Sequence, residues 1–195
     1  MKKAIPKNEK RKDEIVRVAA KLFKEKGYSA ITMRDIAKAL DIKAASLYNH
    51  IKSKQDLLKI IIISIAEEFT DKMQIVCSSK ETSIEKLQKI VALHVDIAYK
   101  NPYSMGALNN DWMHLEEELE YYLKLRNSYE NNFRNIIKEG IKTGEIINTN
   151  AEITVFSILS TLRSLYLWIP KKEGLTAEEL TKNLNQVLIS GIQNH

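Results

Sequence analysis

The chain has 195 residues, of which 44% are hydrophobic and 28% charged, with 6 Gly and 3 Pro. These values are typical of a globular protein built from helices, because Gly and Pro are the residues that interrupt helices. The basic start is not followed by the apolar stretch of a signal peptide. The most apolar run, residues 57–65, is far shorter than the roughly 20 residues that span a bilayer. The single cysteine, Cys77, excludes an intrachain disulfide. We therefore expect a cytoplasmic protein without a membrane partner.

The net charge of +5 is unevenly distributed along the chain. Residues 1–54 hold 15 Lys/Arg against 6 Asp/Glu, whereas residues 55–195 hold 15 Lys/Arg against 19 Asp/Glu. A basic module followed by a mildly acidic body indicates a polyanionic partner for the first part only. A solvated, lysine-rich surface has the same composition, so charge alone leaves both interpretations open. The domains predicted from this division and from the helix pattern are residues 1–54 and residues 55–195.

The basic module contains three predicted helices. Apolar residues at helical spacing predict the first helix over residues 13–26. Thr32 and Asp35 form a capping-box pattern that begins a second helix of about two turns. A tight turn at Asp41 leads to a third short helix over residues 44–51. Two short helices joined by a tight turn match a helix-turn-helix, although a plain three-helix bundle has the same periodicity.

Residues in this module resemble the DNA-binding domain of the TetR family of repressors. The motif is Thr32-x-Arg34-x-Ile36-Ala37, then Leu47-Tyr48-x-His50, then Lys54-x-x-Leu57-Leu58. The resemblance covers roughly residues 10–60 and implies that the third helix enters the major groove of operator DNA. Two positions depart from the family pattern. Asp41 stands where Gly is usual, and Lys43 replaces the Ser or Thr that normally opens the recognition helix.

The resemblance and the donor chemistry of the side chains together imply a set of DNA-binding residues. The set is Thr32, Arg34, Lys43, Ala44, Ala45, Ser46, Tyr48, Asn49, His50 and Lys54. Tyr48, His50, Lys54 and Thr32 are expected to contact phosphates, and Lys43 is a further candidate. Arg34 is expected to bind a guanine edge, and Asn49 an adenine edge. The alternatives are a core position for Tyr48 and, for Arg34, an ion pair with Asp35 or a contact to a phosphate.

The body is predicted to be helical throughout, which makes the fold class all-α. The predicted helices are residues 54–78, 83–100, 102–110, 111–142, 150–169 and 176–193. The capping box Ser53-Lys54-Gln55-Asp56 begins the first of them, which would join the two domains. Apolar stripes run along residues 155–169 and 180–192. The family resemblance implies that these last two helices form the interface of a homodimer. An ordinary intrachain core would produce the same stripes.

Residues 110–195 resemble the subgroup of the TetR family that senses acyl-CoA thioesters. The resemblance rests on Arg126-x-x-Tyr129-x-x-x-Phe133, on Glu139-Gly140-x-x-x-Gly144 and on the stretch from Leu162 to Pro170. It implies the ligand-binding residues Trp112, Met113, Arg126, Tyr129, Phe133, Arg163 and Tyr166. Arg126 or Arg163 would bind the anionic end of the ligand. Aromatic residues that only build the core, or a cationic ligand balanced by residues 116–118, are the alternatives.

An enzymatic function is not expected. His94 and His114 have no partners at metal-ligand spacing, and no nucleophile motif surrounds Cys77. We therefore predict no catalytic residue, no metal site and no cofactor. The expected function is that of a repressor that a small apolar or amphipathic ligand releases from palindromic double-stranded operator DNA. The alternative is an architectural nucleic-acid binder that needs no ligand.

Overall fold

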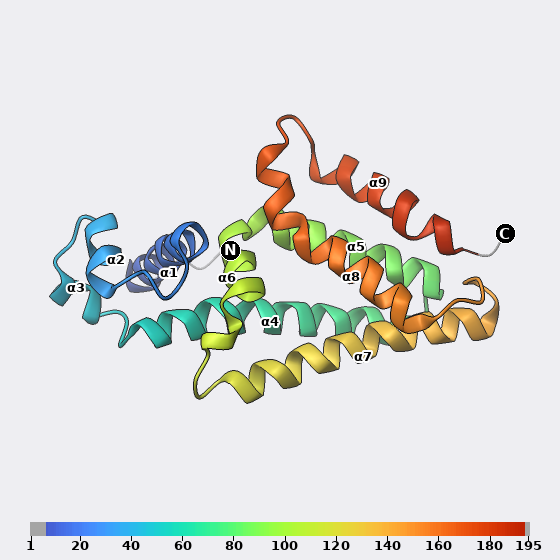
Figure 1. Ribbon diagram of the computed structural model, residues 1–195, viewed down its shortest axis with the longest axis horizontal. Coiled ribbons are helices and arrows are strands. Elements are labelled where there is room, and N and C mark those ends of the chain that lie inside the picture. Colours follow the sequence, from blue (N-terminus) through green and yellow to red (C-terminus); the bar gives the residue numbers. More distant parts are fainter. Residues whose placement is uncertain (1–6, 194–195) are drawn as a thin grey trace. The chain divides into compact units, whose positions relative to one another are not determined.

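The computed structural model describes residues 7–193, and the regular elements within them are helical. Apart from one isolated bridge between Ile146 and Gln193, these residues form no β pairing. The α-helices are α1 (Lys7–Lys26), α2 (Met33–Ala39), α3 (Ala44–Tyr48), α4 (Lys54–Ser78), α5 (Ser83–Lys100), α6 (Pro102–Asn110), α7 (Leu119–Thr143), α8 (Ala151–Trp168) and α9 (Ala177–Leu188). Three short 3-10 helices are η1 (Trp112–His114), η2 (Ile169–Lys171) and η3 (Ser190–Ile192). The all-α prediction is confirmed (Figure 1).

The chain divides into two compact units. Unit 1 takes the residues up to Ile65 together with Tyr103–Tyr122, and unit 2 takes Ala66–Pro102 together with the residues from Leu123 on. The helices α4 and α7 each contribute residues to both units. The predicted domain boundary after residue 54 separates a DNA-binding part from a ligand-binding part, and this functional division stays a prediction. As a compact body, unit 1 also includes nearly all of α6 and the start of α7.

The core of unit 1 is made by apolar positions that recur once per helical turn. Its fully buried side chains include Ile15, Phe23, Ile36, Leu47, Leu57, Leu58, Ile61 and Ile62. Gly106 of α6 packs directly on α1, since a Cβ atom there would lie 3.0 Å from Cγ of Lys24. The three N-terminal helices therefore share one core with the first half of α4 and with α6.

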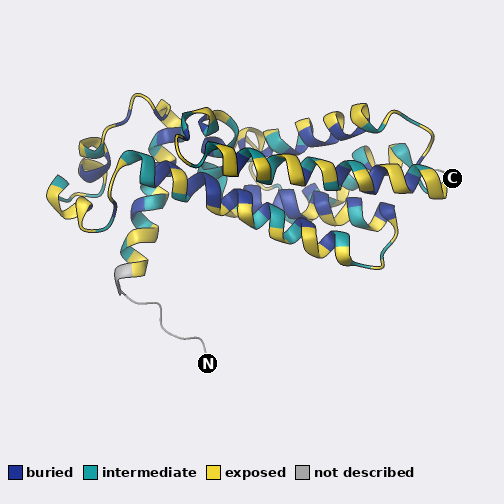
Figure 2. Cartoon of the chain, turned by 90° about the horizontal axis from the view of Figure 1, so that it is seen from below, coloured by how far each residue is buried: buried dark blue, intermediate teal, exposed yellow. Residues whose placement is uncertain are grey.

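Unit 2 is organised around α5, which packs against both α8 and α9 (Figure 1). Its core includes Met73, Leu87, Ile90, Val91, Ile97, Phe133, Ile137, Ile158 and Leu162. Buried positions form stripes along the helices, with exposed positions on the opposite sides (Figure 2). Near the end of α7, a Cβ atom on Gly140 would lie 2.6 Å from Cδ1 of Ile146, so no larger residue fits there without movement.

Three predicted helices, residues 54–78, 83–100 and 102–110, have the bounds that the structure shows. The predicted helix over residues 111–142 is wrong in its first part. The structure has η1 there, followed by non-helical residues before α7 begins at Leu119. Leu115 is buried with an extended backbone (φ −66°, ψ 129°), so packing in unit 1 outweighs the helical preference of the Glu-rich sequence that follows.

Helix ends differ from the predictions by a few residues. The third helix ends at Tyr48 rather than residue 51, α1 begins at Lys7, and α9 ends at Leu188 before η3. The sequence also offers the basic segment Lys2–Lys12 for additional minor-groove or phosphate contacts, and this segment lies partly outside the described residues.

Candidate DNA-binding interface and effector site

The N-terminus of α2 is fixed by the predicted capping box. The Thr32 backbone N–H donates to Oδ2 of Asp35 at 2.8 Å, and the Asp35 backbone N–H donates to Oγ1 of Thr32 at 3.2 Å. The Thr32 hydroxyl also donates to Oδ2 of Asp35 at 2.6 Å. These hydrogen bonds lower the pKa of the Asp35 carboxyl. Asp35 thus caps the helix through Thr32, and the neighbouring Arg34 is exposed to solvent.

The turn between α2 and α3 sets the direction in which α3 leaves the motif. Asp41 has φ +53°, a left-handed conformation that Asp tolerates better than most residues other than Gly. The Ile42 N–H then donates to the carbonyl of Ala37 at 3.0 Å and closes the turn. Lys43 precedes α3 with an extended backbone and makes no side-chain cap. Both departures from the family pattern are therefore accommodated without disturbing the motif.

The helix α3 is anchored by Leu47 and exposes its other side. Leu47 is fully buried, whereas Tyr48 is 53% exposed, which rules out a core position for this tyrosine within the chain. Of the other residues predicted to bind DNA, Ala45, Ser46 and Asn49 are exposed and Ala44 and His50 are half-buried. A surface hollow between α2 and α3 is lined by Arg34, Ala37, Lys38, Asp41, Ile42, Lys43 and Ala44. Three of these seven residues are cationic and one is acidic, so the hollow favours an anion.

Lys54 has a structural role that the sequence did not indicate. Its ammonium donates to the carbonyl oxygens of Tyr28 at 3.1 Å and Ile31 at 3.0 Å, and it lies 4.1 Å from the centre of the Tyr28 ring. Lys54 therefore ties the start of α4 to the segment between α1 and α2. The Ser53 side chain caps α4 as predicted, but Asp56 accepts from the Lys52 N–H instead of completing the box. A phosphate contact by Lys54 stays a prediction.

Residues 111–118 contact α4 and the segment between α1 and α2 within unit 1. The Gln55 side-chain amide donates to the carbonyl of His114 at 2.9 Å and to Oε1 of Glu116 at 3.0 Å. The His114 ring stacks on Tyr28 with a centroid distance of 5.3 Å. Lys59 forms an ion pair with Glu118. Two of the three carboxylates considered as partners for a cationic ligand, Glu116 and Glu118, are thus engaged by unit 1 side chains.

A buried aromatic group lies in unit 2 where α4, α5 and α7 meet. The hydroxyl of Tyr129 is 2.9 Å from Nε2 of His94, and the Phe69 ring is 4.6 Å from the His94 ring and 5.7 Å from the Tyr129 ring. Burial lowers the pKa of His94 to about 3, and the positive charge of Arg163 acts in the same direction. Burial also raises the pKa of Tyr129. His94 and Tyr129 are therefore neutral at physiological pH.

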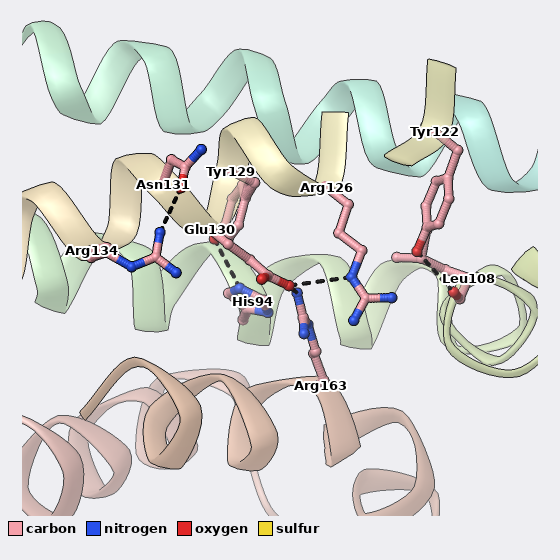
Figure 3. A network of polar contacts seen from close by, with 9 residues as sticks. All are labelled: His94, Leu108, Tyr122, Arg126, Tyr129, Glu130, Asn131, Arg134 and Arg163. Carbon is pink, nitrogen blue, oxygen red and sulfur yellow. Dashed lines mark hydrogen bonds and ion pairs between the residues drawn. The ribbon is translucent and has the colours of Figure 1, made fainter. Parts of the chain in front are cut away.

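Beside this group, two arginines share one carboxylate. Oε1 of Glu130 accepts from Nη2 of Arg163 at 2.6 Å and from Nε of Arg126 at 3.2 Å. Figure 3 shows Glu130 between Arg126, from the same helix α7, and Arg163, from α8. Burial opposes ionisation of Glu130, but the hydrogen bonds and charges of the two arginines outweigh it and lower its pKa. The side chains of Arg126 and Arg163 are each 33% exposed, so solvent reaches this cluster.

The predicted ligand-binding residues are distributed over both units. Arg126, Tyr129, Phe133, Arg163 and Tyr166 belong to unit 2, and the three aromatic residues among them are buried. Trp112 and Met113 belong to unit 1, where Trp112 stacks on Tyr122 and Met113 is 59% exposed.

Sequence reasoning did not select His94 or Glu130 as ligand-site residues. His94 repeats the helical spacing of Ile90 and Val91 on the buried side of α5, and this is the signal that marks it as a buried polar residue.

The apolar stripe predicted on α8 is part of the intrachain core. Its residues Val155, Ile158, Leu159, Leu162, Leu165 and Tyr166 are all buried. The exposed side of α8 carries a second apolar set, Ile153, Phe156, Leu167 and Trp168, and α9 exposes Val187. Among the described residues, only Ala151–Lys171 is long and apolar enough to cross a membrane, with a mean hydropathy of 1.3. The buried side of this helix accounts for much of that apolar character.

Comparison with known families identifies the chain. Residues 15–61 match the model of bacterial regulatory proteins of the tetR family, and residues 80–192 match the model of the tetracyclin repressor-like C-terminal domain. A capped helix-turn-helix on a helical body and these two matches define a DNA-binding transcriptional regulator. The chain belongs to the TetR family.

Individual relatives agree over nearly the whole chain. The transcriptional repressor KstR2 of Rhodococcus jostii is 23% identical over 185 residues, covering 93% of this chain and 91% of the relative. The structure of the ketosteroid transcriptional regulator KstR2 of Mycobacterium tuberculosis has a TM-score of 0.89 at 20% identity, covering 95% of this chain and 96% of that one. The structure of AibR in complex with isovaleryl coenzyme A and operator DNA has a TM-score of 0.78 at 20% identity, covering 92% and 98%. At these identities the structural matches establish the fold, and the relatives are regulators rather than enzymes.

Proposed function

We propose that this protein is a homodimeric repressor in the cytoplasm, released from palindromic operator DNA by an anionic acyl compound such as an acyl-CoA thioester. The observation that carries the DNA-binding part is the exposed side of α3 on a capped helix-turn-helix within a strongly basic module. The observation that supports the ligand class is the partly exposed Arg126–Glu130–Arg163 cluster beside buried aromatic side chains.

On the DNA side, side-chain chemistry assigns the roles. Arg34 is exposed, and its guanidinium can donate to O6 and N7 of one guanine. Tyr48, Lys43 and His50 offer hydrogen-bond donors to phosphates and so set the register on the duplex. Ala45 and Ser46 are small enough for close approach to base edges, and Asn49 offers a bidentate contact to adenine.

Dimerisation uses the exposed apolar side of α8 together with α9. Phe156 is 72% exposed and Val187 is 73% exposed, and exposed apolar groups of this kind mark interaction surfaces. A twofold symmetric dimer presents two recognition helices to two half-sites, one helical turn or a multiple of it apart. The homodimer therefore accounts both for this surface and for recognition of a palindrome.

On the effector side, two partly exposed arginines lie beside each other at Glu130, and a planar guanidinium suits a phosphate or carboxylate. The neighbouring buried side chains, including Phe133 and Tyr166, provide apolar surroundings for an acyl chain. The complex of AibR with isovaleryl coenzyme A and operator DNA supports this ligand class for a protein of the same fold.

Release from DNA requires that the effector bind one conformation more tightly than the other. A tenfold loss of operator affinity corresponds to a coupling free energy of about 1.4 kcal/mol. Since α4 contributes residues to both units, a shift of this helix is the simplest route between effector and DNA.

The test is selection of genomic DNA fragments by the purified protein, followed by sequencing. A single palindromic motif is the expected result, and adding octanoyl-CoA should weaken its binding. Diffuse, salt-sensitive binding without a motif would instead show a non-specific architectural binder. Specific operator binding that no acyl-CoA changes would leave a repressor of a different effector class.

A further inference from the structure

One ring nitrogen of His94 lacks a partner although it is buried. His94 is 3% exposed, and its Nδ1 has no hydrogen-bond partner among the described residues. Its other nitrogen, Nε2, is 2.9 Å from the hydroxyl of Tyr129. Buried polar atoms in native proteins are nearly always hydrogen-bonded, so an unpaired one points to a group that binds there.

The protonation of the ring follows from its single partner. Tyr129 is buried, and within residues 7–193 its hydroxyl has His94 as its hydrogen-bond partner. The hydroxyl hydrogen is satisfied only if Tyr129 donates to Nε2. A neutral imidazole carries one proton, which then resides on Nδ1. Nδ1–H is therefore a buried donor in need of an acceptor.

The surroundings of this donor define the acceptor. The Phe69 ring packs 4.6 Å from the His94 ring and makes one side of it apolar. The charge of Arg163 is near enough to act on both His94 and Tyr129, and Arg163 also reaches Glu130 at the partly exposed cluster. Figure 3 shows His94, Tyr129, Glu130 and Arg163 in one group contributed by α5, α7 and α8. From the apolar Phe69, through the donor on His94, to the charged Arg163, these groups match a ligand in which a polar oxygen joins an apolar chain to an anionic head.

We propose that Nδ1–H of His94 donates a hydrogen bond to the carbonyl oxygen of the acyl effector, either a thioester or a free carboxyl group. This proposal rests on the proposed effector class and assigns a specificity-determining residue within it. A ligand that lacks the carbonyl leaves the buried donor unpaired and therefore binds more weakly. The length of the apolar chain changes the affinity of ligands with and without the carbonyl to the same extent. We expect the anionic head of the ligand to replace the Glu130 carboxylate on Arg163 as the ligand binds.

The test compares thioesters with thioethers of equal chain length by calorimetry. Butyryl-, octanoyl- and palmitoyl-CoA are each paired with the alkyl-CoA thioether, which lacks only the carbonyl oxygen. The full-length protein is expected to bind the thioester of the best-fitting pair about tenfold more tightly. Octanoate is the probe that tests whether the bound carbonyl belongs to a free carboxyl group. A preference for octanoate over octanoyl-CoA that the substitution His94→Gln abolishes would show that the bound carbonyl belongs to a carboxylate.

Two substitutions test the contributions of the two ring nitrogens of His94 separately. In His94→Gln the amide reaches the position of Nε2 but leaves nothing at Nδ1, whereas in His94→Asn the amide reaches the position of Nδ1. His94→Gln is expected to reduce the thioester preference to about twofold or less, and His94→Asn to retain most of it. Operator binding and the melting temperature of each variant establish that it is folded.

An NMR measurement needs no substitution. In protein labelled with ¹⁵N-histidine, His94 is expected to show the Nδ1–H neutral tautomer, and this proton should shift downfield when octanoyl-CoA binds. The Nε2–H tautomer, an equal affinity for thioester and thioether, or a preference that persists in His94→Gln would each overturn the proposal while leaving an acyl effector in place. Failure of every probe to bind would overturn the proposed effector class as well.

Discussion

At the scale of single residues, a variant of Lys54 tests whether this lysine stabilises the fold in addition to contacting DNA. Lys54→Met removes two hydrogen bonds from an ammonium to the carbonyls of Tyr28 and Ile31. Because hydrogen bonds of charged groups contribute more than neutral ones, the free energy of unfolding should fall by about 2 kcal/mol, measured by urea denaturation. The matched control is Lys43→Met, an exposed lysine whose loss should weaken operator binding without changing stability. An unchanged free energy of unfolding in Lys54→Met would show that Lys54 does not stabilise the fold and would leave phosphate binding as its expected role.

His94 gives the stability of the protein a pH dependence. Its pKa is about 3 in the folded chain and 6.5 in the reference state, so the unfolded chain binds a proton first as the pH falls. Stability from this residue is therefore lost progressively from about pH 6.5 down to about pH 3. Between pH 7 and pH 5 the loss is about 2 kcal/mol.

The measurement is urea denaturation of wild type and His94→Gln at several pH values. The Gln variant should show a shallower decrease toward acid, whatever its stability at neutral pH. Parallel curves for the two proteins would contradict a buried, neutral His94. The other histidines are the same in both proteins, so they cancel in the comparison.

At the scale of elements, the structure distinguishes two apolar sides of α8. One side is buried in the chain, and the other exposes Phe156 by 72%. Phe156→Glu places a charge in the proposed dimer interface, so we expect a folded monomer and a rise of at least about 100-fold in the dimer dissociation constant. Sedimentation equilibrium measures this. Ile75→Glu on α4 is the matched control, since Ile75 is 71% exposed but lies outside the proposed interface. Equal dissociation constants would place the dimer interface elsewhere.

Helical periodicity predicted those elements whose bounds are set by local signals. Thr82 caps α5 in a capping box with Glu85, and Asn101 followed by Pro102 ends it, so residues 83–100 could be predicted from their own sequence. The break before α7 is different in origin. It depends on bonds from Gln55, about sixty positions earlier, and no local pattern encodes such a partner.

The same difference applies to the candidate sites. The helix-turn-helix lies in one continuous segment, so motif spacing placed Arg34 and Tyr48 on exposed sides of their helices. The polar cluster of unit 2 joins α5, α7 and α8, whose pairing appears only in three dimensions. Sequence reasoning therefore named Arg126, Tyr129 and Arg163 by resemblance but not His94 or Glu130.

At the scale of the whole molecule, effector and operator binding are linked by one free energy. If saturating octanoyl-CoA weakens operator binding tenfold, saturating operator DNA must weaken octanoyl-CoA binding tenfold, which is about 1.4 kcal/mol in both directions. Calorimetry measures the affinity for octanoyl-CoA with and without operator, and fluorescence anisotropy measures the affinity for operator with and without octanoyl-CoA. We expect the two affinities to change by the same factor. Phe156→Glu should retain octanoyl-CoA affinity but lose this effect of DNA, since a monomer presents only one recognition helix. An octanoyl-CoA affinity that operator DNA leaves unchanged in the wild-type dimer would show that this ligand is not the effector.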